Sequence, residues 1–200
     1  MDDLAGQDTR FVLRSKFLRL FGGAYTLFDT AGRVVAYAQL KRFRLREDIR
    51  VFDDASRARE RLSIRTQSVF DFSGAYDVID STSGERVGTW QRSGLKSTFM
   101  QDHWRMLDTH GVQTGELAED NIVKALLRRA VDTLAWLLPQ KYELRMQGQV
   151  VATYRQQFNP FIYKLDIDLS PSAGTAQEER LDRHMALAVA ILLAAIEGRQ

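Results

Sequence analysis

Cysteine is absent from this 200-residue chain, and histidine occurs only three times. The lack of cysteine excludes disulfides, thiol catalysis and any zinc or iron–sulfur centre held by thiolates. His103 and His110 fall in expected turns and His184 at an expected helix start, without the spacing of a zinc site, so we expect no metal and no cofactor. Prolines number three, and no Pro-rich or Ser-rich tract is long enough to indicate extended disorder.

Long apolar runs are equally scarce, and the one that exists is short for a membrane span. Residues 185–196 are twelve apolar residues in a row, whereas crossing a bilayer takes about 20. Charged residues at 178–183 prevent its extension toward the N-terminus. A helix that is apolar on every face must be buried in protein or in lipid. We therefore predict a core helix within residues 177–196, the alternative being a membrane anchor.

Most of the remaining chain alternates between apolar and polar residues, which indicates β-strands. Three segments, 25–38, 76–90 and 142–154, each contain two such runs joined by a short polar link with a glycine, which is typical of a hairpin. Each hairpin is followed by a similar pair of apolar runs, so the chain resembles a threefold repeat of one meander. Only an enclosing sheet can cover every face of the apolar helix, so we predict a closed antiparallel barrel around it.

A second helix is expected at residues 120–138, outside the strand pattern. Its apolar residues recur at helical spacing: Ile122, Val123, Leu126, Leu127, Ala130, Val131, Leu134 and Leu137. Asp120 or Asn121 is a suitable N-cap, and Pro139 ends the helix.

Several stretches resemble the LURP-one-related family of the tubby C-terminal-like superfamily. They are FLRLFGGAYTLFD at 17–29, GRVV at 32–35, RVFDD at 50–54, FDFSGAYDV at 70–78, GERVG at 84–88, and the apolar terminal helix. The resemblance implies a single domain over residues 10–198, after a flexible N-terminus at 1–9, with about twelve strands around the helix. Tubby-like members bind phosphoinositides through basic residues on the barrel wall, and the related phospholipid scramblases act at membranes. No local tubby lipid-binding motif is recognisable here.

The positive charge of the chain is concentrated in its first quarter. The net charge is +2, but residues 10–50 hold ten basic and three acidic side chains. Such asymmetry is typical of a surface that binds anions. In a strand, Arg42, Arg44 and Arg46 would share one face about 7 Å apart and could grip phosphates. The alternative is an ordinary barrel wall whose arginines face the solvent and pair with Glu47 and Asp48.

A loop at 93–97 could add a small anion site through its backbone amides, unless it is merely a strand connection. The residues that we expect to bind an anion are Lys41, Arg42, Arg44, Arg46, Arg14, Lys16, Arg19, Arg92 and Lys96.

The function that these features favour is a non-enzymatic binding module in the cytoplasm, peripheral at a membrane surface. Its ligand would be an anionic phospholipid headgroup or another phosphate-bearing or acidic partner. One alternative is a scaffold that binds a protein partner or itself through the 120–138 helix or a barrel edge. Another is an enzyme with an unfamiliar site at the barrel end, but no Gly-x-Ser-x-Gly elbow is present. Nucleic acid is not expected, because aromatic and basic residues do not interleave over a long surface.

Overall fold

A computed structural model of the protein describes residues 8–16, 23–41, 48–67, 74–93, 103–119, 140–159, 161–178 and 180–196. The predicted helix at 120–138 lies outside the described residues. The strands are β1 (Arg10–Lys16), β2 (Ala24–Phe28), β3 (Val34–Lys41), β4 (Asp48–Phe52), β5 (Glu60–Thr66), β6 (Ala75–Asp80), β7 (Arg86–Ser93), β8 (His103–Leu107), β9 (Gln113–Glu119), β10 (Lys141–Met146), β11 (Gln149–Gln157) and β12 (Ile162–Asp168).

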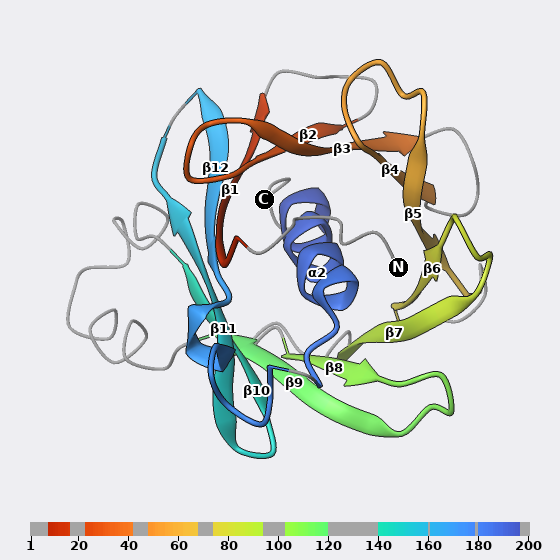
Figure 1. Ribbon diagram of the computed structural model, residues 1–200, viewed down its shortest axis with the longest axis vertical. Coiled ribbons are helices and arrows are strands. Elements are labelled where there is room, and N and C mark those ends of the chain that lie inside the picture. Colours follow the sequence, from red (N-terminus) through yellow and green to blue (C-terminus); the bar gives the residue numbers. More distant parts are fainter. Residues whose placement is uncertain are drawn as a thin grey trace.

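These twelve strands form a closed antiparallel barrel. Each strand pairs with its neighbours in the sequence, and β1 pairs with β12 to close the ring. Figure 1 shows the helix α2 (Arg183–Ile196) running through the middle of the ring, with β1 and β7 on opposite sides of it. The prediction of a closed barrel around the apolar C-terminal helix is confirmed. His103, expected in a turn, instead begins β8.

The alternation of the strands explains which side chains meet the helix. In β12, Tyr163, Leu165 and Ile167 are buried, and the residues between them are not. Successive side chains of a strand point to opposite faces, so the apolar residues face the interior of the barrel and the polar residues face its outside. Each strand thereby contributes one apolar stripe to a single core around α2.

The helix α2 fills the barrel because no face of it is polar. Twelve of its fourteen residues, from His184 to Ala195, are buried. Gly88 of β7 allows a close approach, since a Cβ added there would lie 2.9 Å from Cε of Met185 and 2.7 Å from the carbonyl oxygen of Leu107. The Tyr154 hydroxyl donates to the carbonyl oxygen of Ala186 over 3.0 Å. Complete burial raises the pKa of Tyr154 far above its ordinary value.

The helix begins later than the sequence predicts. We expected helix from residue 177, but the chain at 170–181 forms a short 3-10 helix, η2 (Ser170–Ser172), and turns. Ser172 donates through its hydroxyl to the carbonyl oxygen of Leu169, and Thr175 likewise to that of Ser172. Such local bonds compete with helix formation, which starts only after Asp182 provides a cap.

One end of the barrel holds the start of the central helix. We call the entry end the one where α2 begins, together with the strand connections at 29–33, 53–59, 81–85, 108–112 and 147–148. All of these connections are described.

Candidate functional site

Two basic residues lie directly opposite each other on the outer wall, Arg14 of β1 and Lys164 of β12. Both point outward, because their neighbours Leu13 and Leu165 are buried in the core. Opposite residues of an antiparallel pair have Cβ atoms about 5 Å apart, so like charges there repel. The Arg14 guanidinium lies over the Phe28 ring, 4.9 Å from its centroid, and this contact holds it against the wall.

The Arg14–Lys164 pair differs from the other described cations of the wall in lacking a carboxylate. Most of the others form ion pairs: Arg10 with Asp168, Arg50 with Asp48 and Glu60, Arg61 with Asp53, Arg86 with Asp77, and Lys141 and Arg145 with Glu143. The rest face an acid across the strand pairing: Arg65 faces Asp48 and Asp77, Arg105 faces Glu116, and Arg155 faces Asp166. Arg155 also faces Lys141, but Lys141 is paired with Glu143. In the described wall, Arg14 and Lys164 face each other with no acid directly opposite either of them, and Asp166 lies two residues further along β12.

The other predicted anion-binding residues are only partly placed. Lys16 ends β1 and Lys41 ends β3, two strands separated by β2, at the end of the barrel opposite the entry end. Neither side chain is described. Arg19, Arg42, Arg44, Arg46 and Lys96 lie outside the described residues.

Arg92 is not part of the same surface. Its guanidinium carbon lies 5.8 Å from the centroid of the Trp104 ring, and Trp104 is fully buried. Because Arg92 follows Trp90 by two residues in β7, it shares the inward face of that strand. β7 lies across the barrel from β1, so the structure separates Arg92 from Arg14.

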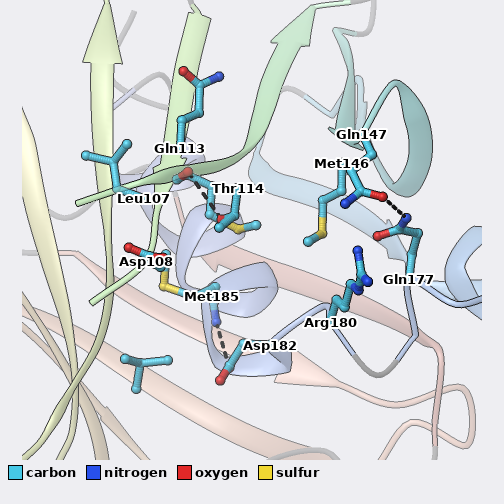
Figure 2. A pocket seen from close by; sticks show the side chains of 12 residues that line it. Leu107, Asp108, Gln113, Thr114, Met146, Gln147, Gln177, Arg180, Asp182 and Met185 are labelled. Carbon is cyan, nitrogen blue, oxygen red and sulfur yellow. Dashed lines mark hydrogen bonds between the residues drawn. The ribbon is translucent and has the colours of Figure 1, made fainter. Parts of the chain in front are cut away.

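A pocket of about 430 Å³ opens at the entry end, and we call it the entry pocket. Figure 2 shows side chains from several strands, the 170–182 segment and the start of α2 pointing into it. Its apolar side consists of Met106, Met146, Met185, Val87 and Leu107, and its polar side of Asp108, Gln113, Thr114, Gln147, Gln177, Arg180 and Asp182. Small-molecule sites commonly enclose roughly 300–1,000 Å³, so the entry pocket is large enough for a metabolite.

Two carboxylates of the entry pocket are already oriented by the backbone. Oδ1 of Asp182 accepts from the backbone N–H of His184 at 2.7 Å and of Met185 at 3.4 Å, as in a helix N-cap. Burial alone would raise the pKa of Asp182, but the His184 imidazole, whose Nδ1 lies 3.2 Å from Oδ1, and the backbone N–H groups of His184 and Met185 outweigh this and leave the pKa below the ordinary value. For Asp108 the backbone N–H of Val112 is the main cause that lowers the pKa, against a smaller effect of burial. Both groups therefore carry negative charge at neutral pH.

Sequence reasoning missed Lys164 and the entry pocket. Lys164 lies 150 residues from Arg14 in the sequence, and only the pairing of the first and last strands brings the two together. The polar residues of the pocket are ordinary turn and strand-end residues in the sequence. The expectation that any pocket would form at an end of the barrel did point to the correct place.

No known protein family model matches the chain, and no curated protein matches it in sequence. The helices within the described ranges include none that is long and apolar enough to cross a membrane. Within the same described ranges, no three His, Asp or Glu side chains lie close enough together to hold a metal ion.

Proposed function

We propose that the protein is a non-enzymatic binding module that holds a phosphate-bearing anion, such as a phospholipid headgroup, on its outer wall. The observation that carries the proposal is the Arg14–Lys164 pair, two facing cations without a carboxylate between them. A phosphate can accept hydrogen bonds from both side chains at once and neutralise their repulsion. The contact of Arg14 with Phe28 orients the guanidinium before a ligand arrives.

The surroundings of the pair favour a membrane-bound source of the phosphate. Strands β1, β2 and β3 are adjacent, and Lys16 and Lys41 end at the same side of the barrel. Residues 17–22 and 42–47 follow those strand ends and add four arginines, Arg19, Arg42, Arg44 and Arg46. Clusters of basic residues attract anionic lipids by about 1 kcal/mol per charge near the surface. The resemblance to the LURP-one-related family supports the same class of ligand.

Liposome co-sedimentation tests the proposal. The full chain would be mixed with phosphatidylcholine vesicles, alone or doped with phosphatidylserine or a phosphoinositide, at low and at high salt. The test variant is Arg14→Gln/Lys164→Gln. The matched control is Arg65→Gln/Arg105→Gln, which removes the same two charges from wall positions that face carboxylates. A soluble inositol phosphate added as competitor distinguishes a headgroup site from general attraction to the surface.

We expect binding to doped vesicles alone, weakened by salt, lost in the test variant and kept in the control. Equal losses in both variants would mean that net charge drives binding and that the pair is not a site. Absence of binding would overturn the membrane proposal and favour a protein partner. Binding to neutral vesicles that persists in salt would show insertion of an apolar segment instead.

A further inference from the structure

Gln177 gives the entry pocket an acceptor that the protein leaves unused. Its side chain is buried, with 5% of the residue exposed, and its Nε2 donates to Oε1 of Gln147 over 3.0 Å. Its Oε1 has no hydrogen-bond partner in the described structure. Leaving a buried polar atom unpaired is destabilising, and such atoms in native proteins commonly mark a place where a ligand or water binds. In Figure 2 this oxygen points into the pocket beside Met146.

Arg180 supplies a cation next to that acceptor. Its exposed guanidinium lines the pocket and forms no ion pair or hydrogen bond with any residue that the structure places. Figure 2 shows the Arg180 guanidinium and the Gln177 amide directed to the same part of the pocket. A guanidinium binds a carboxylate through two parallel hydrogen bonds. Gln177 and Arg180 together therefore suit a ligand whose hydrogen-bond donor and carboxylate are neighbours.

The two carboxylates of the pocket select against a ligand that is only an anion. Asp108 and Asp182 both use Oδ1 for backbone bonds, and neither Oδ2 has a partner among the described residues. The two carboxylates and the Arg180 guanidinium together give the lining of the pocket a net negative charge of one. A positively charged donor on the ligand would be attracted to these carboxylates, whereas a second anionic group would be repelled.

The remaining wall of the pocket is apolar and adaptable. Met106, Met146 and Met185 line it, and methionine side chains fill irregular gaps because they are unbranched and polarisable. The absence of a side chain at Gly115 allows Met106 and Met146 to pack closely there, since a Cβ added at this position would lie 3.0 Å from Cε of Met106 and 3.2 Å from Cγ of Met146. This wall suits a flexible apolar side chain.

We propose that the entry pocket binds a free α-amino acid with an apolar side chain. Its ammonium group donates to Oε1 of Gln177, its carboxylate accepts from Arg180, and its side chain packs against the methionines. The ammonium and carboxylate groups of an α-amino acid share one carbon atom, which matches the adjacent acceptor and cation. This site is separate from the Arg14–Lys164 pair and does not depend on the function proposed for it.

Isothermal titration calorimetry with three probes tests the proposal on the full chain. L-Norleucine carries both polar groups, hexanoate lacks the ammonium group, and hexylamine lacks the carboxylate. Gln177→Leu removes the acceptor and Arg180→Gln the cation, while Arg105→Gln removes one exposed charge outside the pocket as a matched control. Arg14→Gln/Lys164→Gln serves as a second control, which should bind norleucine normally.

We expect norleucine to bind at least about tenfold more tightly than either partial probe, since hydrogen bonds to charged groups are stronger than those between neutral groups. Each pocket variant should weaken norleucine binding by about tenfold or more, and both controls should leave it unchanged. Lack of norleucine binding at millimolar concentration would overturn the proposal. So would hexanoate binding as tightly as norleucine, or unchanged binding in both pocket variants.

Discussion

The indole of Trp90 donates a hydrogen bond from Nε1 to the carbonyl oxygen of Met185 over 3.0 Å, joining the barrel wall to the central helix across 95 residues of sequence. Tyr154 makes the equivalent bond to the next carbonyl, that of Ala186, from another strand. Apolar packing alone would not choose one rotation or depth for a helix that is apolar all round. These two directional bonds fix both, and thereby place Met185 and Asp182 at the entry pocket.

Removing the Tyr154 hydroxyl should therefore lower the stability of the protein. In Tyr154→Phe the Ala186 carbonyl keeps its bond within the helix, so we expect only the net value of one buried hydrogen bond to be lost, about 1 kcal/mol. Trp90→Phe should cost more, because it also removes volume from a fully buried site. Urea denaturation of the variants measures both free energies of unfolding. Unchanged stability in Tyr154→Phe would show that the bond does not hold the helix.

The Asp182 cap should make stability depend on pH in the acid range. The pKa of Asp182 is lowered in the folded protein, so its contribution is full above the unfolded pKa of about 3.9 and is lost as the pH falls through the folded value. Asp182→Asn keeps an N-cap but removes the charge, and Asp182→Ala removes both at a cost of about 1 kcal/mol.

Denaturant unfolding between neutral pH and about pH 2 measures the Asp182 contribution. Other aspartates with lowered pKa values, such as Asp29 and Asp54, add to acid unfolding of every variant and cancel in the comparison. We expect wild type to exceed Asp182→Asn in stability at neutral pH and the difference to shrink as the pH falls. A difference that stays constant with pH would contradict the lowered pKa.

Reversing one charge of the Arg14–Lys164 pair should stabilise the protein while abolishing anion binding. Lys164→Glu places a carboxylate opposite Arg14 and replaces repulsion by attraction, a gain of about 0.2–1 kcal/mol that salt should reduce. Thermal unfolding at low and high salt measures it, and co-sedimentation of the same variant measures binding. Loss of stability in Lys164→Glu would show that the two side chains do not face each other without a ligand.

The placement of Arg92 shows where sequence reasoning stops for the anion site. The sequence predicts that Arg92 belongs to an anion-binding loop; the structure places Arg92 on the inward face of β7, beside Trp104, and residues 94–97 of that loop lie outside the described residues. Which face of a strand is buried depends on the register with both neighbouring strands, and a single residue of shift reverses it. The late start of α2 has a local cause instead, since the hydrogen bonds of Ser172 and Thr175 outweigh the helical preference of the residues after them.

The sequence by itself determined the barrel and its buried helix, because both follow from local patterns. Alternation every second residue makes each strand one-sided, and twelve apolar residues in a row can be covered only by a surrounding sheet. The tertiary structure alone decided that Arg14 faces Lys164, and that Gln177 and Arg180 open onto one pocket with three methionines. The physical reason is barrel closure, which joins the first strand to the last and gathers turns from distant segments at one end. Such contacts depend on how the whole ring closes, and no local pattern in the sequence records them.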